Sequence, residues 1–176
     1  MRLVIQRVLE ASVSVQGNQV SKIGKGFLVL LGITHEDDQT VVEKYVNELL
    51  HLKAWPKIQT KSNQGNEEEK ANNHSHSHSN ININSPLEFE SNIMENDYEV
   101  IVVSQFTLYG KMKGAKPDFH SSLNHEEANL LYENFVNLLK KSYKEDKVQT
   151  GKFRNRMAVN IVNDGPVTLI IDSAKE

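Results

Sequence analysis

The stretch Tyr98–Gly110, YEVIVVSQFTLYG, contains the clearest structural signal in the chain. Four consecutive β-branched residues, Val100–Val103, are typical of a buried strand, because such side chains favour extended backbone and the run is too short for a helix. Ser104, Gln105 and Thr107 follow directly. Polar side chains at the end of a buried strand often carry chemistry, since a rigid scaffold positions the loop that they begin. On spacing alone, the simpler explanation that they satisfy local backbone groups is favoured.

Upstream of this stretch the sequence predicts several strands and one helix. Strands are expected at Met1–Val8, Ala11–Gln16, Val20–Ile23 and Phe27–Ile33, and Leu52–Trp55 is expected to be the start of another strand. Apolar residues recur at helical spacing from Val42 to Leu50, and Thr40-x-x-Glu43 resembles a capping box. Arg7 falls on the apolar face of the first strand. It is either a surface side chain lying over that face or a guanidinium turned inward to hold backbone carbonyls.

Downstream of this stretch, basic loops alternate with a helix and two strands. The expected elements are a basic loop with Lys111, Lys113 and Lys116, a helix over about His125–Tyr143, a second basic loop at Gly151–Arg156, and strands at Met157–Ile161 and Val167–Ile171. Asn124-x-x-Glu127 resembles a capping box at the start of the helix. The segment Asn163–Pro166 favours a plain turn between two antiparallel strands, and a cis Gly165–Pro166 bond is the less common alternative.

The segment Gln59–Ser85 differs from the rest of the chain in composition. Its apolar side chains are only Ala71, Ile81 and Ile83, and it contains the run Glu67–Glu69 and the alternating histidines of residues 74–78. Such a segment cannot bury enough apolar surface to offset its ordering entropy, so a flexible insertion is expected. The histidines lack a carboxylate partner, and for that reason we expect no metal site.

Length, composition and charge limit the possible classes of protein. A chain of 176 residues with 38% hydrophobic and 24% charged residues is expected to form one domain with a core of its own. Cysteine is absent, which excludes disulfide and thiolate chemistry, and no apolar run is long enough to span a bilayer. The net charge is −3, and basic residues outnumber acidic ones only after Asp97, so contact with a polyanion is expected in the second half.

Two separated motifs together resemble those of the D-aminoacyl-tRNA deacylase (D-tyrosyl-tRNA deacylase) family. They are Ser104-Gln105-Phe106-Thr107-Leu108 and Asn163-Asp164-Gly165-Pro166-Val167-Thr168, accompanied by MRLVIQRV at residues 1–8 and KGAKPDF at residues 113–119. The resemblance covers the chain except for roughly residues 59–90. We therefore expect a single deacylase domain over residues 1–176, with residues 59–90 as a flexible, low-complexity insertion. The expected fold is mixed α/β, with largely antiparallel sheets in a partly closed, barrel-like arrangement and two main helices packed on it.

The resemblance implies a cytoplasmic, homodimeric hydrolase that cleaves the ester bond of D-aminoacyl-tRNA and so removes D-amino acids before translation. Glycyl-tRNA is expected as a further substrate, and no cofactor, metal or membrane is implied. Catalytic positions carried over from the motif are Ser104, Gln105, Phe106 and Thr107. Gly165 and Pro166 are expected to reach into the pocket of the partner subunit and contact the substrate there, with Arg7 beside them. Phe153 and Met157 are expected at the terminal adenosine, and Lys113 at a phosphate.

Several alternatives stay open at this point. Thr107 is either a nucleophile or part of a site in which the backbone N–H groups of Phe106 and Thr107 stabilise the oxyanion, which we prefer. The family usually has glycine where this chain has Arg154, so the loop near the adenosine either gains a phosphate contact or changes shape. The alternatives to a D-specific deacylase are a non-catalytic tRNA- or nucleotide-binding module and a deacylase with shifted amino-acid specificity.

Overall fold

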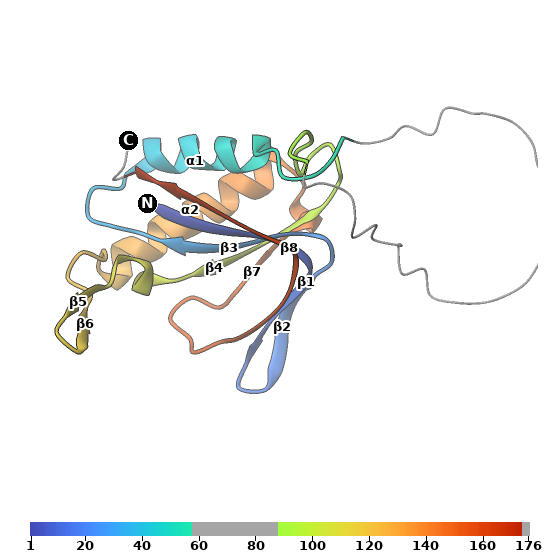
Figure 1. The fold of residues 1–176 in the computed structure, drawn as a ribbon. Coiled ribbons are helices and arrows are strands. Elements are labelled where there is room, and N and C mark those ends of the chain that lie inside the picture. Colours follow the sequence, from blue (N-terminus) through green and yellow to red (C-terminus); the bar gives the residue numbers. More distant parts are fainter. Residues whose placement is uncertain (58–87, 174–176) are drawn as a thin grey trace, which may run out of the picture.

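The computed structural model describes residues 1–57 and 88–173. In this part of the chain a mixed sheet carries two helices side by side on one of its faces, and the small β5–β6 hairpin projects from one end (Figure 1). The strands and their bounds are β1 (Arg2–Val15), β2 (Asn18–Ile23), β3 (Gly26–Gly32), β4 (Glu99–Ser104), β5 (Lys111–Lys113), β6 (Lys116–Asp118), β7 (Val148–Thr150) and β8 (Ala158–Asp172). The helices are α1 (Gln39–His51) and α2 (His125–Ser142), with single 3₁₀ turns at Phe106–Tyr109 and Glu145–Lys147.

The long strand β1 organises the sheet. Its first half pairs antiparallel with β3 and its second half with β2, while β8 pairs antiparallel along almost its whole length. Strands β3, β4 and β7 continue the sheet in parallel, as expected for strands that are connected through helices. The strand order is β2-β1-β3-β4-β7, with β8 on the other edge of β1, so the sheet curves into the partly closed, mixed α/β arrangement that the sequence predicts.

Two apolar cores hold the layers together. The larger one lies between the sheet and the helices and includes Phe27, Tyr45, Ile93 and Phe135 at 0% exposure. The smaller one fills the curved side of the sheet around Val13. Two buried clusters on opposite faces explain why β3 and β4 are apolar on both sides, which sequence patterning alone indicates for central strands.

Helix α1 begins two residues earlier than its capping-box motif suggests. The Asp38 side chain accepts a hydrogen bond from the Val41 N–H and serves as N-cap, whereas Thr40 lies inside the first turn and donates to Asp38. Helix α2 begins as expected, because Asn124 accepts from the N–H groups of Glu126 and Glu127. Satisfying these otherwise unpaired donors fixes where each helix starts.

Four predictions differ from the structure. The two strands predicted at residues 1–8 and 11–16 form one continuous strand, β1. Residues 52–55 contain no regular strand, only an isolated bridge between Trp55 and Ser91. Residues 158–172 form one continuous strand in place of two strands joined by a turn, because β1 pairs with residues on both sides of Gly165. The basic loop at residues 111–116 forms the β5–β6 hairpin. The predicted insertion falls mainly in residues 58–87, and its histidine repeat also lies outside the described residues.

Candidate active site

Strand β4 delivers the polar segment that follows it to one end of the sheet. Ser104 pairs with Leu31 at the end of the parallel β3–β4 ladder, and the Gln105 N–H donates to the Leu31 carbonyl at 2.8 Å. The chain then turns into the 3₁₀ turn Phe106–Tyr109, which we call the catalytic turn because catalytic residues are expected in it. The N–H groups of Phe106 and Thr107 begin this turn, and the first donors of a helical turn have no partner within it.

The two polar side chains of this segment contact each other. The Gln105 Nε2 donates to the Thr107 Oγ1 at 3.0 Å, and Thr107 is exposed. An amide N–H can donate a hydrogen bond but cannot take a proton from a hydroxyl. The partner of Thr107 therefore orients its side chain without activating it as a nucleophile.

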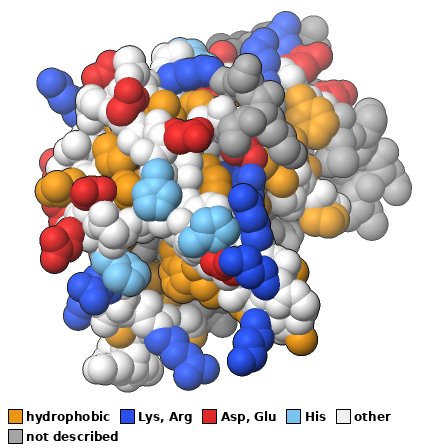
Figure 2. Space-filling model, turned by 90° about the vertical axis from the view of Figure 1, so that its left-hand side faces the viewer, with side chains coloured by type: hydrophobic (Ala, Val, Ile, Leu, Met, Phe, Trp, Pro, Cys, Tyr) orange, Lys and Arg blue, Asp and Glu red, His pale blue; other side chains and the backbone are white. Residues whose placement is uncertain are grey.

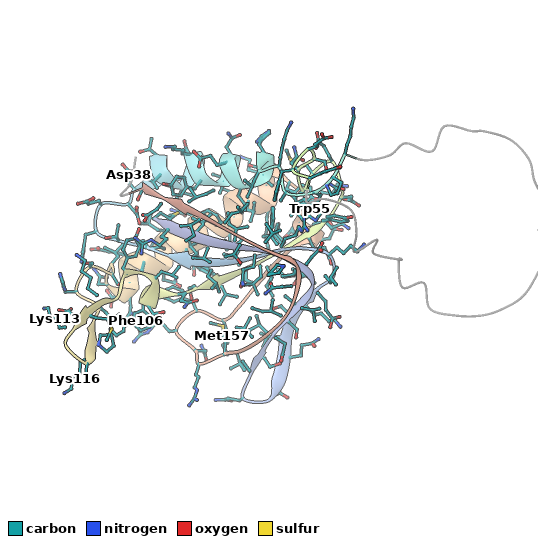
Figure 3. The ribbon with its side chains drawn as sticks, viewed as in Figure 1. Asp38, Trp55, Phe106, Lys113, Lys116 and Met157 are labelled. Carbon is teal, nitrogen blue, oxygen red and sulfur yellow. The ribbon has the colours of Figure 1, made fainter. Side chains whose placement is uncertain are left out.

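A cavity of about 370 Å³ opens beside this segment. Its lining combines apolar walls with a few polar groups: Leu31, Ile33, Ser104, Gln105, Phe106, Leu123, His125, Ala128, Phe153, Arg154, Asn155 and Met157. Of the residues expected at the site, the structure brings Ser104, Gln105 and Phe106 together with Phe153 and Met157 in this cavity, while Thr107 is not among its lining residues. In Figure 3, Met157 lies to the right of Phe106, on the loop that leads into β8.

The aromatic side chains of the cavity are held by neighbouring rings. Phe106 is 51% exposed and meets Phe119 edge-on at a centroid distance of 5.0 Å. Phe153 packs on Tyr132 at 5.5 Å, and the Tyr132 hydroxyl donates to the Val102 carbonyl at 3.0 Å. Burial raises the pKa of Tyr132, so this phenol stays protonated and keeps its hydrogen bond. One wall of the cavity is thus fixed to strand β4.

Arg2 connects the catalytic turn to the last strand. Its Nη1 donates to the Leu108 carbonyl at 2.5 Å, and its Nε and Nη2 donate to Asp172 Oδ2 at 2.9 and 2.7 Å. The guanidinium also lies 4.8 Å from the centre of the Tyr109 ring. The rigid fork of donors on arginine suits such a three-way contact. Sequence reasoning missed this residue, since its partners lie more than 100 positions away.

The β5–β6 hairpin projects next to the cavity and carries the lysines of the first basic loop. Lys113 and Lys116 point away from the body of the protein (Figure 3). Lys113 forms an ion pair with Asp118, and His120 Nδ1 lies 2.7 Å from the same carboxylate. The hydrogen bond from Lys113, followed by those from His120, holds the pKa of Asp118 well below its usual range. Lys113 is not among the residues that line the cavity.

The face of the molecule around this hairpin is mixed in chemistry. Figure 2 shows a hydrophobic patch there, bordered by histidine, lysine and arginine side chains. His125 lines the cavity from the first turn of α2, and its ring lies 6.5 Å from that of Phe106. The sequence offers no local signal for His125 or Asn155 as site residues, because only folding places them beside residues 104–106.

Gly165 and Pro166 lie elsewhere. On β1 they are level with Arg7, which pairs with Phe27 of β3. Ser104 pairs with Leu31 of the same strand, four residues from Phe27. At about 3.3 Å per residue this separation is about 13 Å along the strands alone. Within one chain, the structure does not bring this pair to the cavity.

Arg7 holds the backbone around this pair. The Gly165–Pro166 peptide bond is cis, and Gly165 has a φ of +125°. The Arg7 guanidinium is buried and donates to the Asp164 carbonyl at 3.2 Å and to the Ala54 carbonyl at 2.6 Å. Its Nε also lies 3.3 Å from the Asp164 carboxylate. Of the two roles that the sequence left open for Arg7, the structure therefore shows the inward one.

Two further features bear on what the site can be. Among residues 1–57 and 88–173, no cluster of three or more His, Cys, Asp or Glu side chains could hold a metal ion. In the same ranges no helix is long and apolar enough to cross a membrane.

A more open hollow of about 530 Å³ is lined by surface side chains such as Lys53, Phe89 and Glu95. It lies away from the polar end of β4, and we place no site there.

Comparison with known proteins gives one consistent result. The family model described as D-Tyr-tRNA(Tyr) deacylase matches residues 4–73 and 63–172. D-aminoacyl-tRNA deacylase 1 of Mus musculus is 39% identical over 173 residues, covering 98% of this chain and 70% of that protein. D-aminoacyl-tRNA deacylase of Petrotoga mobilis is 38% identical and covers 99% of both.

Solved structures agree in fold. A structure titled c-Myc DNA Unwinding Element Binding Protein superposes with a TM-score of 0.78 at 37% identity, covering 98% of this chain and 99% of that one. A probable eukaryotic D-amino acid tRNA deacylase superposes with a TM-score of 0.69 at 19% identity and covers 97% of each chain, which supports the fold. With a family model matched over nearly the whole chain and relatives close to 40% identical, this chain belongs to the D-Tyr-tRNA(Tyr) deacylase family.

Proposed function

We propose that this protein hydrolyses the ester bond of D-aminoacyl-tRNA and releases the free D-amino acid and tRNA. The observation that carries the proposal is the cavity whose lining joins the end of β4 to Phe153 and Met157, beside backbone donors at the start of the catalytic turn. Family membership and the names of the relatives support the same reaction. We also propose that the enzyme acts in the cytoplasm, where charged tRNA is consumed.

The chemistry assigned to the turn is stabilisation of the oxyanion. Water attacks the ester carbonyl, negative charge develops on its oxygen, and the bond to the ribose oxygen then breaks as that oxygen gains a proton. Fixed N–H donors aimed at the developing charge contribute more than any other single effect in such reactions. The N–H groups of Phe106 and Thr107 are suited to this role, and Gln105 and Ser104 orient the segment that carries them. The hydrogen bond from Gln105 to Thr107 supports this role over covalent catalysis by Thr107.

The terminal adenosine of the tRNA is assigned to the part of the cavity formed by Phe153 and Met157. Phe153 and Met157 offer flat apolar contact for the base, because aromatic and thioether groups stack well on a heterocycle. Lys113, exposed on the neighbouring hairpin, would meet a phosphate of the acceptor end. Such contacts predict an affinity for tRNA that decreases as salt increases.

Selection for the D-configuration is assigned to Gly165 and Pro166 of a second copy of the chain. One protomer keeps them about 13 Å from the level of Ser104, and this separation supports a dimer in which their carbonyl groups meet the substrate bound by the partner. Strand β8 exposes Ile161, Val162 and Ile170 at 37%, 46% and 62%, an apolar surface that favours association. Arg7, buried behind Gly165, would hold the motif in place.

In this arrangement the partner's carbonyl oxygens accept hydrogen bonds from the substrate α-ammonium group and fix its direction. An L-side chain would then collide with the partner's backbone, whereas a D-side chain would point away from it. No side chain of the enzyme needs to recognise the side chain of the amino acid, so many D-residues should be accepted. Glycine has no side chain to exclude and should be cleaved as well.

The decisive experiment measures hydrolysis of D-tyrosyl-, L-tyrosyl- and glycyl-tRNA by the purified protein. We expect cleavage of the D- and glycyl-esters and none of the L-ester. Binding of tRNA with no hydrolysis of any ester would instead support a non-catalytic module, an alternative suggested by the nucleic-acid-binding title of one solved relative. Equal cleavage of the D- and L-esters would show a deacylase with shifted specificity.

The dimer proposal has its own test. Sedimentation at micromolar concentration should show a dimer. Mixing a Phe106→Ala variant, altered in the cavity, with a Gly165→Ala variant, altered in the donated motif, should restore part of the activity through one intact composite site per mixed dimer. A fully active monomer would contradict the proposal.

A further inference from the structure

Arg154 occupies a backbone position that disfavours it. The Asn155 N–H donates to the Lys152 carbonyl at 3.2 Å and closes a four-residue turn, in which Arg154 is the third residue with a φ of +59°. Turns with positive φ only at the third position usually place glycine or asparagine there, because a Cβ is crowded in left-handed backbone. Such strain commonly accompanies function. An arginine at this position therefore indicates a role for its side chain that glycine could not fill.

The position of the side chain suggests an answer. Residues 152–157 alternate, so that Lys152, Arg154 and Arg156 are exposed while Phe153, Asn155 and Met157 are partly buried. Of the three basic residues, Arg154 alone lines the cavity. The turn thus places one cation at the cavity mouth, next in sequence to the Phe153 ring. Asn155 reinforces this geometry, because its Nδ2 donates to the Phe153 carbonyl at 2.9 Å.

The guanidinium is also available for binding. Within residues 1–57 and 88–173 it makes no hydrogen bond or ion pair. The other two non-glycine residues with positive φ in these ranges, Gln16 and Asp97, have local explanations. Gln16 lies in the β1–β2 turn, and Asp97 is ion-paired with Lys144. Arg154 has no such local partner, and its five N–H donors face solvent at the entrance of a pocket.

We propose that Arg154 binds the phosphodiester group on the 5′ side of the terminal adenosine, and so acts as a substrate-binding residue specific to the nucleic-acid part of the substrate. This inference rests on the proposed function. Phe153 and Arg154 both line the cavity, so a base stacked on Phe153 would bring its ribose 5′-phosphate within reach of the long side chain on the next residue. A planar guanidinium matches two phosphate oxygens, and the contact is charge-assisted.

The test separates the phosphate from the base by comparing two small ligands, adenosine and the dinucleotide CpA. Arg154→Asn removes the charge while keeping a residue that tolerates left-handed backbone. We expect it to weaken CpA binding about tenfold, the size of one charge-assisted hydrogen bond, and to change adenosine binding by less than about twofold. Arg156→Asn is the matched control, because it removes the same charge from the same loop outside the cavity. It should leave both affinities within about twofold of wild type.

Two further measurements complete the design. The Tm of Arg154→Asn and Arg154→Gly should rise by about 2–4 °C, because both residues relieve the strained φ. A decrease of Tm would contradict the assigned strain. For whole deacylated tRNA, the slope of log affinity against log salt should become shallower by about 1 for the Arg154 variants and should stay unchanged for Arg156→Asn.

The results that would overturn the proposal are distinct from those that would overturn the function. Wild-type protein that fails to hydrolyse D-tyrosyl-tRNA refutes the proposed function, whatever Arg154 does. An active wild type whose Arg154→Asn variant binds CpA equally well refutes only the phosphate contact. Loss confined to hydrolysis of D-aspartyl-tRNA, with CpA binding intact, would assign the guanidinium to a substrate carboxylate and would also refute it.

Discussion

Replacing Arg2 with methionine tests whether the catalytic turn needs an external support. The substitution keeps an unbranched apolar side chain but removes the 2.5 Å hydrogen bond to the Leu108 carbonyl and two hydrogen bonds to Asp172. The stacking of the guanidinium on Tyr109 is lost as well. The turn that presents the N–H groups of Phe106 and Thr107 then loses its connection to β8.

The size of the effect follows from the burial of the two partners. The Asp172 side chain is 3% exposed and that of Arg2 is 29% exposed. Removing one member of a fully buried ion pair costs about 3–5 kcal/mol, and the partial exposure of Arg2 reduces this to about 2–3 kcal/mol. For a protein of this size we expect Tm to decrease by about 4–12 °C, at about 2–4 °C per kcal/mol. We expect kcat/KM for D-tyrosyl-tRNA to decrease about tenfold, equivalent to about 1.4 kcal/mol of transition-state stabilisation.

A double variant separates stability from positioning. Arg2→Met combined with Asp172→Leu replaces the ion pair by apolar side chains, so much of the lost stability should return. The Leu108 carbonyl still lacks its donor, and kcat/KM should therefore stay low. Thermal unfolding and steady-state hydrolysis of D-tyrosyl-tRNA, measured below the Tm of every variant, give the two readouts. Unchanged kcat/KM in the single variant, or full recovery of kcat/KM in the double variant, would refute the positioning role.

Three further predictions concern other elements. Asn124→Ala removes the N-cap of α2 and should lower stability by about 1 kcal/mol, whereas Asn124→Asp should not; chemical denaturation measures both. Gly26→Ala should prevent folding, because its Cβ would lie 1.8 Å from the Glu99 carbonyl oxygen in the β3–β4 ladder, and a soluble variant with native circular dichroism would contradict this. Asp118→Asn should lower Tm slightly at pH 7. Because Lys113 depresses the pKa of this carboxylate, its contribution is present above about pH 4 and is lost as pH decreases further. The difference in Tm from wild type should shrink accordingly, and a difference as large at pH 2 as at pH 7 would argue against the ion pair.

Local sequence signals predicted the parts of the fold that depend on local chemistry. The β-branched run of β4 forms a buried strand, and Asn124 starts α2, because side-chain shape and capping act within a few residues. The Asn163–Pro166 segment shows the limit of such signals. Its residues are typical of a turn, yet the strand continues through them because β1 supplies hydrogen-bond partners on both sides. Pairing with a strand more than 150 residues away overrides the local preference.

The candidate site was predictable to a similar extent. The first motif indicated residues 104–107, and the family resemblance indicated Phe153 and Met157. The structure places most of these residues around one cavity because β7, which precedes the Phe153–Met157 loop, pairs with β4. His125 and the support from Arg2 could not be predicted, since each contributes to the site only through contacts between distant segments. The strained backbone of Arg154 is likewise a property of the folded loop and has no signature in composition.

The pairing of β1 with β8 also has a consequence for the order of folding. The first strand cannot complete its hydrogen bonds until residues 158–172 are available, so the contacts that finish the sheet are among the most non-local in the chain. Proteins with high contact order fold slowly, because a long loop must close before its contacts form. During synthesis from the N-terminus, the edge of β1 that pairs with β8 would stay unpaired until residues 158–172 are made. An unpaired strand edge can pair with other chains, which makes nascent chains prone to aggregate. Chaperone demand in this protein should therefore be set by the delay before its last strand leaves the ribosome.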